Sequence, residues 1–264
     1  MKTTVASILE FIDQIAPFNE AESWDNTGLL VGKKNREVKN ILLSLDVTEE
    51  VLNEAIEKKI DLLITHHPII FSGIKTITTD DRLGKLLLKS IENGISIIAA
   101  HTNLDHSFEY GINRHISDLY GLKNVEILCD HDGFGIIGDL ETPLNLHDLT
   151  RKTKDVFRAD TIKYANLIEN ITFSRIAISS GASSDYIEDA IHKQADAFVT
   201  SDIKYHEAQK VLGTNMAIVD VGHFESEFLF LNPFKALLTS KLQSAPHTIN
   251  IYVTESEKPI FKYI

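Results

Sequence analysis

The chain has 264 residues, of which 43% are hydrophobic, and a formal net charge of −12 at pH 7. That length and apolar content suffice for one large domain or two modest ones with buried cores. The acidic balance, with a sequence pI of 5.3, argues against a broad binding surface for nucleic acid or for an anionic membrane. A phosphate-bearing ligand would need metal ions to neutralise its charge.

Cysteine content and the N-terminal segment predict a cytoplasmic protein. The single cysteine, Cys129, excludes an internal disulfide and fits a reducing compartment, and we interpret it as a bystander. The N-terminal segment is amphipathic, with Glu10 and Asp13 where a signal peptide has its apolar core, and no run approaches about 18 apolar residues. We therefore expect neither export nor a membrane partner.

Apolar periodicity predicts alternating strands and helices in the first half of the chain. Helices are expected at about 4–16, from 48 onward, at 81–93 and at 111–120, and buried strands at 41–46, 61–64 and 95–100. Strand, helix and strand in this order form a βαβ unit with parallel strands.

A loop follows the first predicted helix and contains the stretch from Ser23 to Leu30. Its Asp-Asn-Thr-Gly core is typical of turns. The preferred interpretation is a core anchor at Trp24 and a turn at Asp25 and Asn26.

The alternation of strands and helices restarts after a central hairpin. Gly133 to Gly138 is interpreted as a hairpin turn, because the stretch lacks the Lys-Ser/Thr ending of a phosphate-binding loop. Strands follow at 175–179, 197–200 and 216–219, with helices between them. No low-complexity linker separates the halves, so we expect an α/β fold of two three-layer lobes that share an interface. The metal-binding lobe is expected to contain residues 1–124 and 220–264, and the second lobe residues 125–219.

Two adjacent histidines, His66 and His67, stand where the strand predicted at 61–64 ends. Pro68 follows, which cannot donate to a sheet ladder and biases His67 to an extended conformation. Adjacent side chains on an extended backbone point to opposite sides, so the pair suits two ions better than one. An ordinary strand-to-loop exit accounts for the two histidines equally well.

Two further polar clusters also follow predicted strands. His101 and Asp105 come after the strand at 95–100, and the carboxyl ends of strands form ligand sites in open α/β sheets. If a helix starts at His223, that residue and Glu227 lie one turn apart on one face. An exposed helix start, with acidic residues that favour the helix dipole, is the alternative for this pair.

The three clusters together form a coherent ligand set of imidazoles and carboxylates without cysteine. It suits Zn²⁺, Fe, Mn²⁺ or Co²⁺, and two ions about 3.5–4 Å apart need a bridging carboxylate, for which Asp105 and Glu227 are candidates. The sequence contains no Walker loop, no Gly-x-Ser-x-Gly elbow and no HExxH helix, so competing catalytic constellations have little support.

The sequence resembles the Nif-three-like dinuclear-metal family, whose members are commonly labelled GTP cyclohydrolase 1 type 2 homologues. The matching stretches span nearly the whole chain and are highly specific as a set: Trp24-Asp25-Asn26-Thr27-Gly28-Leu29, Thr65-His66-His67-Pro68-Ile69-Ile70, His101-Thr102-Asn103-Leu104-Asp105, Ser180-Gly181-Ala182, and Gly222-His223 with Glu227. The resemblance implies a ring-shaped homohexamer of α/β chains. It also implies two adjacent divalent metal ions and a cavity lined by candidate catalytic histidines; the implied ligands are His66, His67, Asp105, His223 and Glu227, and the implied cavity residues are His101 and His206.

The chain departs from the family pattern in two respects. Ile136 stands where the family tends to have an arginine, in the loop Gly133-Phe134-Gly135-Ile136-Ile137-Gly138, which weakens the expectation of an anionic ligand. A chain of 264 residues has no room for the large inserted domain that some relatives carry, so no regulatory lobe is expected.

The expected function is that of a hydrolase that depends on two divalent metal ions. The ion pair would lower the pKa of a bound water to near neutrality, and His101 or His206 would shuttle protons. The family label implies opening of the purine ring of GTP, although another nucleotide or a phosphoester fits the same metals. The alternative is a non-catalytic metal-binding or oligomeric partner-binding protein, which a closed coordination sphere would indicate.

Overall fold

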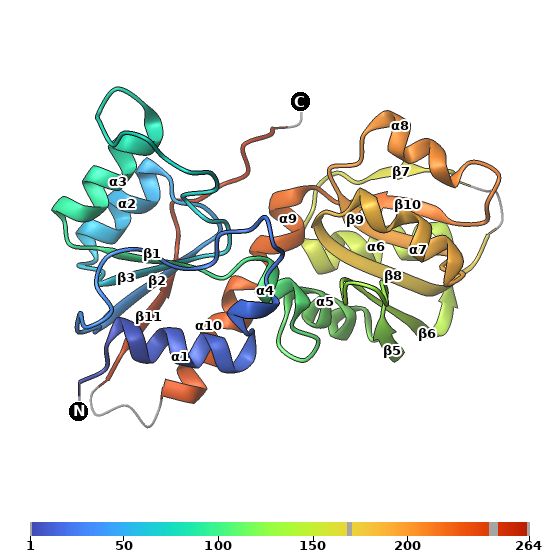
Figure 1. Cartoon of the computed structure of the whole chain (residues 1–264). Helices are drawn as coiled ribbons and strands as arrows, with labels where there is room; N and C mark the ends of the chain where they lie inside the picture. The colour runs from blue at the N-terminus through green and yellow to red at the C-terminus, as the bar shows by residue number, and fades with distance from the viewer. Residues whose placement is uncertain (1, 168–170, 243–247, 263–264) are drawn as a thin grey trace. The chain divides into compact units, whose positions relative to one another are not determined.

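The structure is a computed structural model that describes residues 2–167, 171–242 and 248–262. The chain divides into two compact units: unit 1 is Met1–Ser107 with Phe230–Lys258, and unit 2 is Phe108–Leu229 with Pro259–Ile264. Each unit is built of a sheet and helices (Figure 1), which confirms the predicted α/β class. None of the helices among the described residues is both long and apolar enough to cross a bilayer.

Unit 1 is organised around one largely parallel sheet. Its strands are β1 (Gly28–Val31), β2 (Asn40–Ser44), β3 (Leu62–Thr65), β4 (Ser96–Ala99) and β11 (Asn250–Val253), and its helices are α1 (Val5–Ile15), η1 (Phe18–Glu20), α2 (Glu49–Glu57), α3 (Arg82–Glu92), α4 (Thr102–His106) and α10 (Leu231–Lys241). The strand order is β1-β4-β3-β2-β11. All neighbours are parallel except β1, which runs antiparallel to β4.

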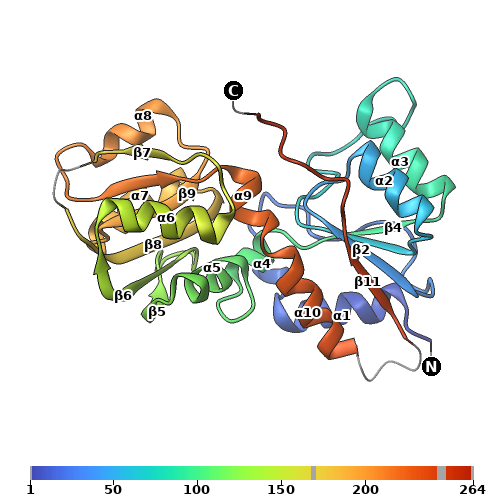
Figure 2. The same cartoon turned by 180° about the vertical axis from the view of Figure 1, so that it is seen from behind.

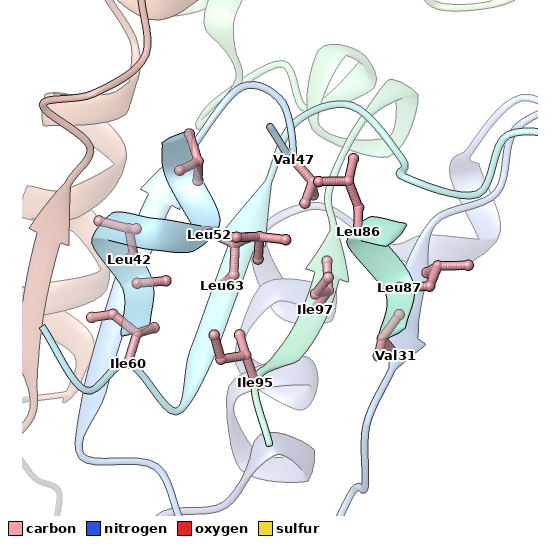
Figure 3. Packing of buried hydrophobic residues seen from close by; sticks show 12 residues of the cluster. Val31, Leu42, Val47, Leu52, Ile60, Leu63, Leu86, Leu87, Ile95 and Ile97 are labelled. Atoms are coloured by element: carbon pink, nitrogen blue, oxygen red, sulfur yellow. The ribbon is translucent and has the colours of Figure 1, made fainter. Parts of the chain in front are cut away.

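The helices of unit 1 cover both faces of its sheet. Side chains of α2 and α3 pack with Leu42, Leu63 and Ile97 of the parallel strands in one buried cluster (Figure 3). Figures 1 and 2 show α1 and α10 on the opposite face. Helices α2 and α3 begin where the sequence predicts. The side chains of Thr48 and Asp81 cap these two helices by accepting hydrogen bonds from backbone N–H groups of the first turn.

Unit 2 contains a mixed sheet. Its strands are β5 (Lys123–Ile127), β6 (Ile136–Leu144), β7 (Lys163–Ala165), β8 (Phe173–Ala182), β9 (Ala197–Ser201) and β10 (Ala217–Asp220), and its helices are α5 (Ile112–Tyr120), α6 (Leu146–Phe157), η2 (Ser184–Tyr186), α7 (Ile187–His192), α8 (Tyr205–Ala208), η3 (Gln209–Val211) and α9 (His223–Phe228). The strand order is β5-β6-β8-β9-β10-β7. The central β8, β9 and β10 are parallel, and the outer pairs are antiparallel.

The sheet of unit 2 is also covered on both faces. Ile187 and Ala190 of α7 pack with Phe198 and Ile218 in a buried cluster, and Figures 1 and 2 show α6 on the other face. The hairpin predicted around Gly133 is confirmed, since β5 and β6 pair antiparallel on either side of that turn.

Candidate metal centre

The carboxyl ends of β3 and β4 bring three imidazoles together in unit 1. His66 and His67 directly follow β3, and His101 follows β4 after Ala100. The ring centroid of His66 lies 5.1 Å from that of His67 and 5.0 Å from that of His101. One nitrogen from each ring can be chosen so that all three lie within 4.8 Å of one another. This spacing would allow the three rings to bind one metal ion or a close pair of ions.

The expectation that His66 and His67 point to opposite sides is wrong. The strand ends at Thr65, so the alternation of side chains along a strand no longer applies. The Thr65 hydroxyl donates a hydrogen bond of 2.8 Å to the carbonyl of His67, which turns the backbone. Both rings therefore reach the same edge of the sheet.

The Nδ1 atoms of His66 and His67 each face an oxygen. His66 Nδ1 lies 2.9 Å from the carbonyl oxygen of Ala100, and because a carbonyl only accepts, this nitrogen carries the proton. His67 Nδ1 lies 3.2 Å from a carboxylate oxygen of Asp46. With the proton on Nδ1, the lone pair that binds a metal is on Nε2 in both rings.

His101 is held in the same way by a buried carboxylate. The side chain of Asp25 is fully buried, and its Oδ1 lies 3.0 Å from His101 Nδ1. Its other oxygen accepts hydrogen bonds from the N–H and the hydroxyl of Thr102, at 3.1 and 2.6 Å. Burial alone would raise the pKa of Asp25, but the hydrogen bonds from His101 and Thr102 outweigh it and lower the pKa to about 2. Asp25 is therefore ionised at neutral pH and holds a proton on His101 Nδ1.

Asp105 comes from the short helix α4, which starts directly after His101. The carbonyl of His101 accepts hydrogen bonds from the N–H groups of Leu104 and Asp105, which fixes this turn. Asp105 Oδ1 lies 3.7 Å from His66 Nε2, and both side chains are buried. Two ligand atoms on one tetrahedral zinc ion lie roughly 3.3 Å apart, so this pair needs only a small shift to share an ion.

The second pair of predicted ligands lies in unit 2. A helix begins at His223, as predicted. Nε2 of His223 lies 3.2 Å from Oε2 of Glu227, which is one turn further along this helix. Glu227 is buried, with 3% of its surface exposed. His223 Nδ1 faces a carboxylate oxygen of Asp202 at 2.8 Å, so its Nε2 is again the metal-binding nitrogen.

Two glycines make this second arrangement possible. Gly222 has a φ of +90° and caps the N-terminus of α9, a conformation that other residues rarely adopt. Gly181 has a φ of +67°, and a Cβ added there would lie 2.5 Å from Oε1 of Glu227. Its N–H also donates to the hydroxyl of Ser226, at 3.0 Å. The Ser180-Gly181-Ala182 stretch thus gives Glu227 the space it occupies.

Residues 3–259 match the family described as Duf34/NIF3 (NGG1p interacting factor 3). The chain belongs to this family. A relative from Clostridium acetobutylicum, named GTP cyclohydrolase 1 type 2 homolog, is 34% identical over 257 residues, which cover 95% of this chain and 94% of the relative.

Solved structures agree with this assignment. A Staphylococcus aureus hypothetical protein has a TM-score of 0.91 at 29% identity, over 100% of both chains. A Bacillus cereus protein related to NIF3 shares the fold, with a TM-score of 0.92 at 22% identity, over 100% of this chain and 99% of that one. The match of residues 3–259 to the family confirms the resemblance read from the sequence.

The structure of this NIF3-family chain also places the remaining residues singled out from the sequence. His206 lies on α8, where its Nδ1 is 3.4 Å from Oε1 of Gln209, and Figures 1 and 2 show α8 and α9 in different parts of unit 2. Ile136 is buried at the start of β6, so its side chain belongs to the core. Trp24 is 56% exposed, and its interpretation as a core anchor is wrong.

A third group of potential ligands surrounds the only cysteine. The Sγ of Cys129 lies 2.9 Å from Nδ1 of His131, and Asp132 completes the group. Burial raises the pKa of the Cys129 thiol to about 12, with a further contribution from Asp132. Ionisation of this thiol at neutral pH is therefore disfavoured when no metal ion is bound.

Proposed function

We propose that this protein is a hydrolase dependent on divalent metal ions, which are bound by His66, His67, Asp105, His223 and Glu227. The observation that carries the proposal is that an oxygen atom faces Nδ1 of each of the three ligand histidines. His66, His67 and His223 each direct Nδ1 at an acceptor oxygen, which makes Nε2 the ligand atom. Such acceptors are a regular companion of metal-binding histidines.

Two ions are proposed because imidazoles and carboxylates occur in two sets. Asp105 accompanies His66 at 3.7 Å, and Glu227 accompanies His223 at 3.2 Å. Nitrogen and oxygen donors without thiolate fit Zn²⁺, Fe, Mn²⁺ or Co²⁺. Divalent ions bound there would supply Lewis-acid polarisation of the substrate and a water that ionises near neutral pH.

We propose His101 as the residue that carries protons. Because the ionised Asp25 holds the proton on Nδ1, Nε2 of His101 can accept a proton and return it to a leaving group. Asp25 would also stabilise the charged imidazolium formed on the way. His206 is the second candidate, but its neighbours Gln209 and Tyr205 provide no comparable carboxylate among the described contacts.

The proposed substrate is a purine nucleotide. Relatives named GTP cyclohydrolase 1 type 2 homolog make GTP the first compound to test. In a chain with a net charge of −12, bound cations would neutralise the phosphates of such a ligand. Another nucleotide or a phosphoester would use the same metal chemistry.

The proposal is tested by metal analysis followed by a hydrolysis screen over nucleotides and phosphoesters, with and without chelator. We expect turnover that is lost on chelation and restored by a divalent metal. His66→Asn should lose both metal and turnover, whereas His147→Asn, at an exposed position of α6, should keep both. Turnover that survives verified removal of metal contradicts the proposal. Tightly bound metal without any turnover favours a non-catalytic metal-binding or partner-binding protein.

A further inference from the structure

The Trp24-Asp25-Asn26 stretch is attached to two other parts of unit 1. Asp25 holds His101 and Thr102. The side-chain amide of Asn26 donates a hydrogen bond of 2.6 Å to the carbonyl of Ile70. Ile70 directly precedes Phe71. The stretch is thus fixed both to the start of α4 and to the segment that follows the histidine pair.

These attachments bring two exposed aromatic rings together. The ring centroids of Trp24 and Phe71 are 5.8 Å apart with an interplanar angle of 41°, and each side chain is 56% exposed. Trp24 also meets His101 edge to face, with 6.1 Å between the ring centroids. The pair therefore adjoins the proposed proton carrier.

Such exposure is unusual for large aromatic side chains, since tryptophan is highly buried on average. Neither ring completes the core of unit 1, and hydrogen bonds around Asp25 and Asn26 hold them in place. A planar heterocycle stacks on an aromatic face with little dependence on charge. An acidic chain can use this to recognise an anionic nucleotide through its base.

We propose that Trp24 and Phe71 form a stacking surface for the base of a nucleoside or nucleotide, beside His101. This inference rests on the proposed function, because it identifies the residues that would recognise a purine substrate at the same site. Asn26 is a positioning residue in this arrangement, since its amide links the two segments that carry the rings.

Tryptophan fluorescence provides a direct test, because Trp24 is the only tryptophan of the chain. The full-length protein is titrated with guanosine, both with chelator and with divalent metal, and ribose 5-phosphate serves as the probe without a base. Free N-acetyltryptophanamide corrects for absorption by the nucleoside. We expect saturable quenching by guanosine in both conditions and none by ribose 5-phosphate.

Variants show whether the quenching reports stacking on this pair. Phe71→Leu should raise the Kd of guanosine about 10-fold, and Trp24→Leu should abolish binding measured by calorimetry. Tyr205→Leu, which removes a 76% exposed aromatic side chain from unit 2, should bind as the unchanged protein does. Thermal melting and metal content should stay the same in all three variants, because the altered side chains are exposed.

Absence of saturable quenching by guanosine would overturn the proposal, as would an equal Kd in Phe71→Leu. Emission that responds only to protein concentration would show that the rings serve contacts between copies of the chain, and this outcome overturns it too. Quenching in chelator does not depend on turnover, so the surface can be established even if no hydrolysis is found. Conversely, metal-dependent turnover without quenching would retain the hydrolase and reject the surface.

Discussion

The carboxylate of Asp25 faces Nδ1 of His101 at 3.0 Å, and the charge of Asp25 can be removed with little change of shape. Asp25→Asn should lower turnover about 10- to 100-fold, because a neutral amide stabilises the imidazolium of His101 less well than a carboxylate. Metal content per chain should not change, since Asp25 contacts none of the proposed ligands in the hydrogen bonds described above. The measurement is kcat beside metal analysis.

Asp80→Asn is the matched control, because Asp80 is an exposed carboxylate of the same unit. This variant should leave kcat and the metal content per chain unchanged. If Asp25→Asn instead loses metal together with turnover, His101 is a metal ligand and not a proton carrier.

The predicted ligands can be recognised from sequence because they follow strand ends, whereas their hydrogen-bonding partners cannot. Asp202 contacts His223 from the segment after β9, 21 residues earlier in the chain. Its position depends on how β9 and β10 pair. Asp46, the partner of His67, is the exception that the sequence could have revealed. It ends the strand predicted at 41–46 and so lies at the same edge of the sheet as the histidines.

Strand β8 approaches helix α9 closely at Gly181, and a substitution there tests the position of Glu227. Gly181→Ala should reduce metal binding, because the new Cβ would displace the carboxylate of Glu227. Gly213→Ala is a matched control in the same unit: its φ is also positive, at +83°, but a Cβ there meets nothing within 4 Å. Both variants should lose about 1 kcal/mol of stability from the backbone conformation. Equal metal content in the two variants would contradict this role of Gly181.

The last strand of unit 1 is tied to α2 by a buried carboxylate. Glu54 accepts hydrogen bonds from the Thr254 hydroxyl and the Ser256 N–H, at 2.7 and 3.1 Å, and from the Lys58 ammonium at 2.7 Å. Burial would raise the pKa of Glu54, but the bonds from Lys58, Thr254 and Ser256 lower it to about 2. The ionised form is therefore favoured by folding.

A carboxyl group with a lowered pKa contributes stability that is present above its unfolded value of 4.5 and is lost as the pH falls through about 2. Glu54→Gln should lower the free energy of unfolding by about 2 kcal/mol at pH 7. The difference should shrink as the pH falls below 4.5. Urea unfolding of both proteins from pH 7 to 3 measures it, and Glu57→Gln, exposed on the same helix, should show no such trend. If the difference in free energy of unfolding between wild type and Glu54→Gln stays constant from pH 7 to 3, the ionised form of Glu54 is not the source of the stability.

Elements with a long periodic pattern were predictable, and elements defined by distant pairing were not. The helices at 4–16 and 81–93 match α1 and α3 closely. Strand β11 has only four residues and gains its place by parallel pairing with β2, about two hundred residues earlier. Helix α4 has five residues, which is too short for a hydrophobic period to be visible.

Packing decides which segments of the chain belong to the same compact unit. The predicted boundaries at 124 and 219 assign α5 and α9 to the metal-binding lobe, whereas the compact units group both helices with unit 2. Helix α9 contacts β8 and β9, and α5 contacts β6 and β8. The ligand chemistry of His223 and Glu227 assigns them to the predicted metal-binding lobe, but it does not reveal the sheet on which their helix packs.

We propose that the protein assembles into a homohexamer, as the family resemblance implies. Light scattering on the purified protein should give a mass of about six chains, consistent with closed point-group symmetry. The particle mass should not change over a wide range of working concentrations. A strictly monomeric species would contradict the proposed assembly.

The metal content of Glu227→Gln shows whether this buried carboxylate binds metal. Glutamine keeps the length of glutamate but loses its charge, so a merely structural residue would tolerate it without loss of metal. We expect wild-type protein and Glu225→Gln, altered two residues away on α9, to bind two divalent ions per chain, and Glu227→Gln to lose at least one. The thermal melts of the three proteins in chelator should agree, because the large cores do not depend on the metal. Two tightly bound ions in Glu227→Gln would contradict this prediction and exclude Glu227 from the metal ligands.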